Sequence, residues 1–215
     1  MLADIENILK KYYGYDSFRR GQKEVIESIL NKRDTVAVMP TGSGKSICYQ
    51  IPALVFEGVT VVISPLISLM KDQVDALKEM GIEAAYINSS IGPQELEARL
   101  QAAAAGKYKL LYIAPERLNS FRFLNLLKNI EIEMIAVDEG HCVSQWGHDF
   151  RPSYLNISQV VENLDSRPIL TAFTATATPE VKNDISIQLK MEEPKIYSSG
   201  FDRPNLSFKL RKGID

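Results

Sequence analysis

A glycine-rich loop that ends in a lysine and a hydroxyl occupies residues 40–46, Pro-Thr-Gly-Ser-Gly-Lys-Ser. The backbone N–H groups of such a loop can surround a phosphate, and a helix that starts there directs its positive end at the same charge. Lys45 would reach the β- and γ-phosphates, and the Ser46 hydroxyl would ligate Mg²⁺. Met39 stands where the full G-x-x-x-x-G-K-S pattern has its first glycine, so the pattern is incomplete. The residues expected to hold the phosphates are Thr41, Gly42, Ser43, Gly44, Lys45 and Ser46.

Two consecutive acids, Asp138 and Glu139, directly follow an apolar run at 134–137. Asp138 can hold Mg²⁺ through its water shell, and Glu139 can orient and deprotonate the water that attacks a γ-phosphate. By itself, an Asp-Glu pair after an apolar run is often the exposed start of a helix. Together with the phosphate loop, the pair predicts a site for ATP hydrolysis in which Ser46 and Asp138 hold the metal ion.

Strands and helices must position these residues. The phosphate loop lies between an apolar segment at 35–38 and an amphipathic one, and further apolar runs alternate with helix-like segments. This alternation is typical of an α/β fold of the P-loop kind, with a parallel sheet covered by helices on both faces. Since ligands collect at the carboxyl ends of parallel strands, the motifs should cluster in space. The further strands are expected at 59–63, 84–87, 110–113, 134–137 and 169–173, with helices at 66–80, 94–105 and 179–189.

The composition is that of one α/β domain, because 215 residues with 45% hydrophobic content can bury a sizeable core. A net charge of −2 gives no overall attraction to nucleic acid, so such contacts need a local patch. Cys48 and Cys142 lack metal-ligand spacing and are expected as buried thiols in a reducing compartment. No membrane-length apolar stretch, signal peptide or basic targeting run is evident. We therefore expect a bacterial-type cytoplasmic protein, associated with the nucleoid and without membrane contacts.

A polar segment with aromatic and basic side chains follows the acids at 142–152, Cys-Val-Ser-Gln-Trp-Gly-His-Asp-Phe-Arg-Pro. Trp146, His148, Phe150 and Arg151 are the mixture that stacks on exposed bases and pairs with phosphate. The other interpretation is a tryptophan packed into the core, which the polar neighbours make costly. With the phosphate loop and the acidic pair, this segment resembles the RecQ family of ATP-dependent DNA helicases in superfamily 2, over nearly the whole chain.

The resemblance implies a first RecA-like helicase domain at residues 1–200 and, at 201–215, the start of a linker to a second RecA-like domain. In the family, ATP lies between the two domains and the second domain supplies an arginine finger. The implied activity is 3′-to-5′ DNA unwinding in repair and recombination, with ATP and Mg²⁺ as cofactors and single-stranded and partly duplex DNA as partners. We expect this chain alone to be monomeric, to turn ATP over slowly and to be unable to unwind a duplex.

Two smaller motifs also resemble the family. Tyr15, Arg19 and Gln22 match its adenine-recognition motif, in which an amide bonds the adenine edge, an aromatic ring stacks on the base and a basic group supports phosphate or ribose. The resemblance implies that Thr174 and Thr176 couple the nucleotide state to DNA movement through hydrogen bonds to the acidic motif. We expect His141 to be their partner there, and to act in catalysis with Lys45, Asp138 and Glu139.

Some interpretations stay open. Segments 64–73 and 114–118 look like DNA-contact motifs, although each is also consistent with an ordinary helix N-cap. Gly140 stands where the family usually has alanine and is expected to add local flexibility. The alternatives to a DNA helicase are an RNA helicase motor and a stand-alone ATP-binding switch. The segment at 142–152 favours DNA, and a comparison of nucleic-acid substrates would separate these functions.

Overall fold

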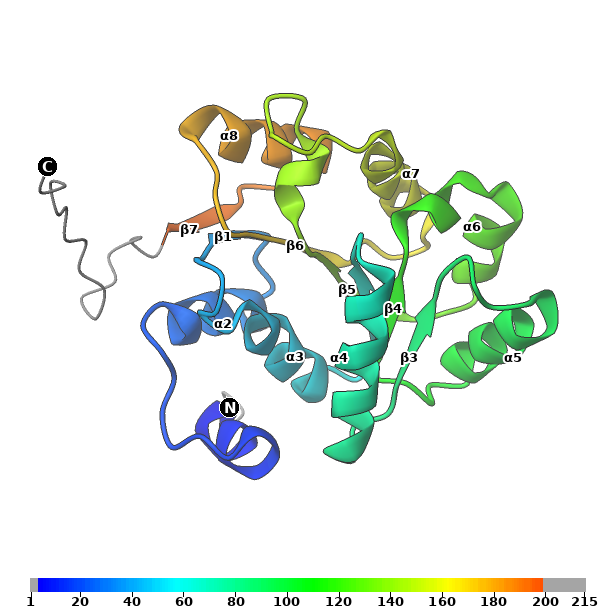
Figure 1. Ribbon diagram of the computed structural model, residues 1–215, viewed down its shortest axis with the longest axis horizontal. Coiled ribbons are helices and arrows are strands. Elements are labelled where there is room, and N and C mark those ends of the chain that lie inside the picture. Colours follow the sequence, from blue (N-terminus) through cyan, green and yellow to red (C-terminus); the bar gives the residue numbers. More distant parts are fainter. Residues whose placement is uncertain (1–3, 199–215) are drawn as a thin grey trace, which may run out of the picture.

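The protein folds around a seven-stranded sheet with helices on both faces (Figure 1). The computed structural model describes residues 4–198, and the expected linker at 201–215 lies outside the described residues. The strand order is β3-β4-β2-β5-β6-β1-β7, and every pairing is parallel. The predicted α/β fold with a helix-covered parallel sheet is therefore confirmed. Within residues 4–198, no helix combines the length and apolar character that a membrane span requires.

The strands are short, and six of them are almost entirely buried. They are β1 (Thr35–Val38), β2 (Val59–Ile63), β3 (Ala84–Ile87), β4 (Leu110–Ile113), β5 (Ile132–Val137), β6 (Ile169–Thr174) and β7 (Lys195–Ser198). The apolar runs predicted the first six. The sequence analysis missed β7, because this edge strand is mostly exposed and pairs only with β1, so that it carries no apolar run.

Eight α-helices accompany the strands in the described region. They are α1 (Ile5–Ile8), α2 (Gln22–Leu30), α3 (Lys45–Val55), α4 (Ile67–Glu79), α5 (Pro93–Ala104), α6 (Phe121–Leu127), α7 (Asn156–Asn163) and α8 (Pro179–Gln188). Short helical turns are η1 (Leu9–Tyr13), η2 (Pro115–Asn119), η3 (Gly140–Val143) and η4 (Pro152–Leu155). The predicted helices correspond to α4, α5 and α8, whereas α6 and α7 were not predicted.

The sheet separates two apolar cores. Helices α2, α3 and α4 pack into one core, and α5 to α8 pack into the other (Figure 1). Successive strand residues face opposite cores, as Val36 and Ala37 of β1 show. Both sheet faces are therefore buried, which explains why these strands are apolar throughout instead of alternating with polar residues.

The strand order brings distant segments of the chain together at one edge. β5, β6 and β1 are neighbours, so the loops that leave their carboxyl ends emerge side by side. Two backbone hydrogen bonds continue this alignment past the strands, from Met39 N to Thr174 O at 2.9 Å and from Asp138 N to Ile63 O at 2.8 Å. The phosphate loop, the acidic pair and the threonine segment thus share one edge of the sheet, as the sequence predicts.

Candidate nucleotide and nucleic-acid site

The phosphate loop has the backbone of an anion cradle. Gly42 and Gly44 have φ angles of 81° and 82°, in the left-handed region that favours glycine. Gly44 caps α3, so Lys45 and Ser46 form the first turn of that helix, at its positive end. The Lys45 ammonium donates only a long 3.4 Å hydrogen bond, to the Met39 carbonyl. A phosphate placed at the start of α3 would give this cation a stronger partner.

The hydroxyl of Ser43 supports the same assignment. Among the side-chain polar atoms of residues 4–198, only Ser43 Oγ and Thr60 Oγ1 are buried without a hydrogen-bond partner. A buried hydroxyl without a partner costs about 1–3 kcal/mol, so its presence in a native structure calls for an explanation. For Ser43, which lies inside the phosphate loop, an anion bound there would supply a partner.

The residues predicted to recognise adenine surround this loop. The Gln22 amide donates to Ser43 O at 3.0 Å and to Gly44 O at 3.2 Å, and it accepts from Arg19 N at 2.8 Å. The Arg19 guanidinium donates to Gly42 O, while the Tyr15 ring is 49% exposed. Gln22 and Arg19 thus brace the phosphate loop, and Tyr15 is accessible for stacking. Their roles toward adenine stay a prediction.

Asp138 lies at the carboxyl end of β5, where it is partly buried. Its carboxylate accepts hydrogen bonds from Ser64 Oγ at 3.4 Å and from Glu139 N at 3.0 Å. Burial, and next the neighbouring Glu139 charge, raise the pKa of Asp138 from 3.8 to about 6. Because burial and the Glu139 charge disfavour the ionised carboxylate, a cation beside Asp138 would stabilise its charged form strongly. This environment is suited to a metal ligand.

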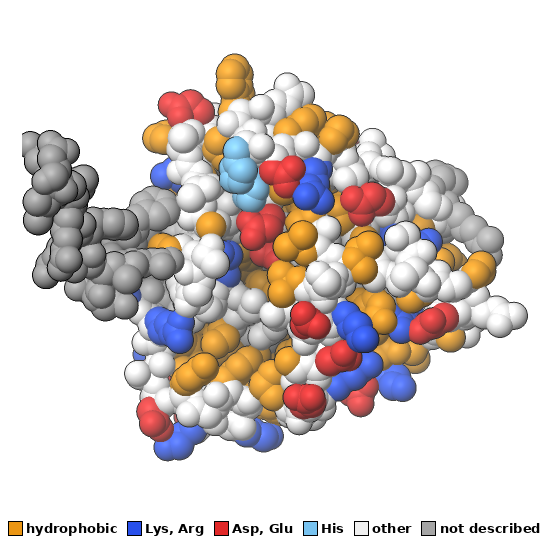
Figure 2. Space-filling model, in the orientation of Figure 1, with side chains coloured by type: hydrophobic (Ala, Val, Ile, Leu, Met, Phe, Trp, Pro, Cys, Tyr) orange, Lys and Arg blue, Asp and Glu red, His pale blue; other side chains and the backbone are white. Residues whose placement is uncertain are grey.

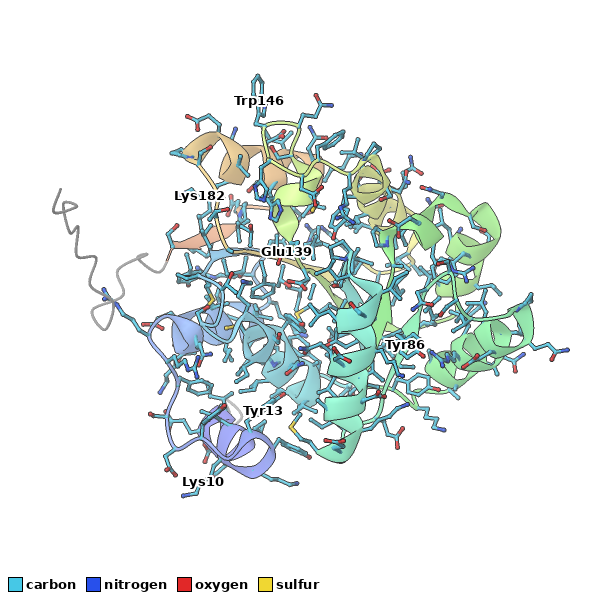
Figure 3. All side chains as sticks on the ribbon, in the orientation of Figure 1. Lys10, Tyr13, Tyr86, Glu139, Trp146 and Lys182 are labelled. Atoms are coloured by element: carbon cyan, nitrogen blue, oxygen red, sulfur yellow. The ribbon has the colours of Figure 1, made fainter. Side chains whose placement is uncertain are left out.

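Glu139 is held in a strained backbone conformation. Its φ of 49° is left-handed, which is uncommon for a residue with a Cβ. This turn directs its carboxylate toward His141, with Glu139 Oε2 3.3 Å from His141 Nδ1. Acidic and histidine side chains adjoin on this face in Figure 2, and Glu139 is central in Figure 3. The geometry fits a base whose side chain is positioned by its neighbours.

His141 connects the acidic pair to the threonine segment. Its Nδ1 lies 2.9 Å from Thr174 Oγ1, and Thr174 Oγ1 donates to Thr176 O at 3.0 Å. Since the Thr174 proton is committed to that carbonyl, His141 Nδ1 must carry the proton of its own bond. Burial lowers the pKa of His141, so the ring is neutral at pH 7. The expected contact is present through Thr174, whereas Thr176 contributes its backbone carbonyl.

The loop after η3 presents its tryptophan to solvent. Trp146 is 78% exposed and projects away from the body of the protein in Figure 3. This exposure rules out the alternative of a core tryptophan. The His148 ring stacks on His141, with centroids 4.2 Å apart and planes 15° apart, so the loop touches the segment that follows the acidic pair. Arg151 is partly buried and forms an ion pair with Asp149 at 2.9 Å.

The base of this loop contains a group of metal-donor atoms. His141, Cys142 and Asp149 each place one such atom within 4.8 Å of the others. Burial raises the pKa of the Cys142 thiol to about 12, and Asp149 is already paired with Arg151. The Cys142 thiol donates to Asp149 Oδ2 at 3.8 Å, so this contact joins the start of the loop to its later part. Cys142 is buried, as the sequence predicts.

The structure gives the remaining predicted residues other roles. Ser64 is buried and its hydroxyl faces Asp138, so it is not free for a DNA phosphate. Arg117 donates to the Asn88 carbonyl at 2.9 Å and thereby fixes a loop. Gly140 is buried, and a Cβ there would lie 3.2 Å from Ala172 Cβ. An alanine there would need a small shift of Ala172, and the expected effect of Gly140 on local flexibility stays a prediction. Phe150, within the segment 142–152, is partly buried, and its contact with nucleic acid stays a prediction.

Sequence reasoning missed residues that act over long chain distances. Tyr154, which is fully buried, donates its hydroxyl to the Asp138 carbonyl at 3.0 Å and so supports the acidic turn. Asp184 of α8 accepts a hydrogen bond from Ser144 in the tryptophan loop. Neither residue belongs to a local pattern, because their partners lie on other elements.

Comparison with known proteins agrees with this geometry. The sequence model of the DEAD/DEAH box helicase family matches residues 19–184. The chain is 55% identical to the ATP-dependent DNA helicase RecQ of Bacillus subtilis over 99% of its own length and 36% of that protein. Its identity to RecQ of Pasteurella multocida is 47%, over 95% of this chain and 32% of the relative. The chain thus spans about a third of the length of these curated relatives.

Solved structures show the same fold at low sequence identity. A DNA-bound structure of the DUF1998 helicase MrfA matches 91% of this chain and 29% of its own, with a TM-score of 0.71 and 18% identity. The Hef helicase domain of Pyrococcus furiosus matches 84% of this chain and 38% of its own, with a TM-score of 0.65 and 19% identity.

The match of the family model over residues 19–184 and the similarity to the curated relatives identify the family. The chain belongs to the DEAD/DEAH box helicase family, and it matches the helicase motor region of RecQ DNA helicases.

Proposed function

We propose that this chain is the first motor domain of a RecQ-like 3′-to-5′ DNA helicase, and that it binds Mg·ATP and single-stranded DNA. One observation carries the proposal. The exposed Trp146 loop leaves η3, whose His141 connects Glu139 to Thr174. A nucleic-acid-binding group and a hydrolytic site therefore share one short continuous segment, as a motor that couples binding to hydrolysis requires.

The chain's own residues provide most of the proposed chemistry. The N–H groups of the phosphate loop and the Lys45 ammonium bind the phosphates and stabilise the charge that develops on them. Glu139, positioned by His141, orients the attacking water and takes its proton. The Ser46 hydroxyl and the Asp138 carboxylate are the oxygen donors that Mg²⁺ prefers. When bound there, the metal ion would neutralise phosphate charge during transfer.

The nucleic-acid contact is proposed for the tip of the loop. An exposed indole can stack on any base, and such stacking contributes about 1–3 kcal/mol per base. Arg151 places a guanidinium at the base of the loop, where it is paired with Asp149 at 2.9 Å, and we propose that it also contacts phosphate. His148, stacked on His141, would transmit nucleic-acid contact to the hydrolytic edge.

The wider organisation is also proposed. Residues 1–200 form the first RecA-like domain and 201–215 begin the connection to a second, which supplies an arginine finger to ATP bound at Lys45. The chain is monomeric and acts on single-stranded and partly duplex DNA in a bacterial-type cytoplasm, associated with the nucleoid. The low coverage of the relatives, 36% for RecQ of Bacillus subtilis, supports a missing second domain.

Binding of oligonucleotides to the wild type and to Trp146→Ala tests the nucleic-acid part of this proposal. We expect the substitution to weaken binding of a single-stranded oligo-dT by about tenfold, as loss of one base stack implies. Tyr108→Ala is the control, because Tyr108 precedes β4 and so lies at the amino-terminal edge of the parallel sheet, opposite the edge that carries the Trp146 loop. A preference of the wild type for oligo-U RNA over oligo-dT would favour the RNA helicase alternative, and equal affinities of wild type and Trp146→Ala would contradict the stacking role.

A further inference from the structure

A hydrogen-bonded latch joins the Trp146 loop to helix α8. Ser144 Oγ donates to Asp184 Oδ2 at 2.6 Å, a short contact typical of a hydroxyl bound to a carboxylate. The same oxygen accepts a hydrogen bond from Trp146 N at 3.2 Å. Ser144 has no exposed surface, whereas Trp146, two residues on, is 78% exposed. The buried end of the turn is therefore fixed while its tip faces solvent.

Ser144 and Asp184, the two ends of the latch, each form a further hydrogen bond that fixes their position. The Ser144 carbonyl accepts from Gly147 N at 3.0 Å, which closes the turn that carries the indole. A Cβ on Gly147 would lie 2.4 Å from the His141 carbonyl, so the turn rests directly on the catalytic segment. The other carboxylate oxygen of Asp184 accepts from Gln188 Nε2 at 3.1 Å. The carboxylate is thus oriented by its own helix and faces the loop.

Helix α8 directly follows the threonine segment in the chain, and Thr178 caps its first turn. It begins directly after Thr178, whose hydroxyl caps it by accepting from Val181 N at 3.3 Å. The buried face of α8, with Val181 and Ile185, packs into the core that α5 to α8 share on one face of the sheet. Any shift of the threonine segment would therefore carry α8, and Asp184 with it.

We propose that Asp184 is a positioning residue for nucleic-acid binding, which holds the Trp146 loop through Ser144 in the shape that accepts a single strand. This inference rests on the proposed function of Trp146. It also gives the loop a second connection to Thr174, through α8, in addition to the direct one through His141. Asp184 does not touch nucleotide or nucleic acid in this arrangement.

The sole tryptophan of the chain makes the latch measurable without any ligand. Steady-state fluorescence anisotropy of Trp146 reports the freedom of this loop alone. We expect Asp184→Ala and Ser144→Ala to lower the anisotropy and to weaken oligo-dT binding by about tenfold, the loss typical of a hydrogen bond to a charged group. Asp184→Asn, whose amide oxygen still accepts from Ser144, should restore most of both. Mg·ATP affinity should be unchanged in all three variants.

Ser186→Ala is the matched control, since its hydroxyl bonds only to Lys182 O within the same helix. Circular dichroism identifies any variant that does not fold, and the comparison then rests on Asp184→Asn and Ser144→Ala. Anisotropy and oligo-dT affinity of Asp184→Ala equal to those of Ser186→Ala would overturn the latch. If the wild type does not bind oligo-dT, the proposed function of Trp146 fails, whereas the anisotropy still decides whether Asp184 holds the loop.

Discussion

At the scale of single residues, Asp138 shows a conflict between stability and function. Its pKa is raised from 3.8 to about 6, so the folded protein favours the protonated form. The stability from this preference is fully present below pH 3.8 and is lost as the pH rises through about 6. We predict that Asp138→Asn raises the free energy of unfolding by about 2 kcal/mol at pH 8 and hardly at pH 4.

Urea denaturation of wild type and Asp138→Asn at these two pH values checks this prediction. The same substitution should abolish ATP turnover, because an amide is a poor ligand for Mg²⁺. An equal effect on stability at pH 4 and pH 8 would show that ionisation of Asp138 carries no cost.

Protonation of Asp138 should also weaken the binding of Mg·ATP by the wild type as the pH falls below about 6.

A second residue-scale prediction concerns the hydrogen bond of His141. Thr174→Val removes the nearer of the two oxygens that face His141 Nδ1 and leaves Glu139 Oε2 at 3.3 Å, so the ring loses its connection to the threonine segment and the Glu139 carboxylate is drawn to the Nδ1 proton instead of the attacking water. Turnover of ATP should fall by about tenfold or more while the KM for Mg·ATP changes little. Thr60→Val is the control, since its buried hydroxyl has no partner and its removal should leave stability equal or higher. A rise in KM with unchanged kcat in Thr174→Val would place Thr174 in binding instead.

At the scale of elements, the phosphate loop depends on Gln22 as well as on its glycines. A Cβ on Gly44 would lie 2.4 Å from Gln22 Nε2, which donates to the loop carbonyls. Gly81 has a similar φ of 76° and open space around it, so Gly81→Ala measures backbone strain alone. We predict that Gly44→Ala costs about 1–2 kcal/mol more unfolding free energy than Gly81→Ala. Equal losses in guanidinium denaturation would mean that Gln22 adds nothing to the loop.

The same scale shows what the sequence could predict. β1 to β6 and the phosphate loop were predictable because buried parallel strands form continuous apolar runs and the loop needs glycines at fixed places. α7 was not, because it is short and its Asn-, Ser- and Val-containing sequence has low helix propensity, so that packing of Ile157, Val160 and Val161 against the core has to hold it. Tyr154 and Asp184 were missed for another reason, since the contacts that define them join separate elements.

At the scale of the whole molecule, the predicted activity is limited by what one RecA-like domain can supply. The chain covers 36% of RecQ of Bacillus subtilis, and we propose that an arginine finger lies on the part of the protein that it does not cover. An arginine finger contributes about 10³–10⁵ in rate. We therefore predict slow ATP turnover by this chain, without stimulation by oligo-dT, measured as phosphate release. Rapid turnover that oligo-dT stimulates would mean that the chain assembles a complete site, for example by self-association.

Calorimetric titration of Mg·ATP into the wild type and Lys45→Ala tests the central claim, that the edge formed by β1, β5 and β6 is a nucleotide site. Lys71→Ala, on the exposed side of α4, is the matched control. Since the Lys45 ammonium would form a charge-assisted bond to phosphate, we expect Lys45→Ala to weaken binding by about 10- to 100-fold and Lys71→Ala to have no effect. Undiminished binding of Mg·ATP by Lys45→Ala would contradict the account.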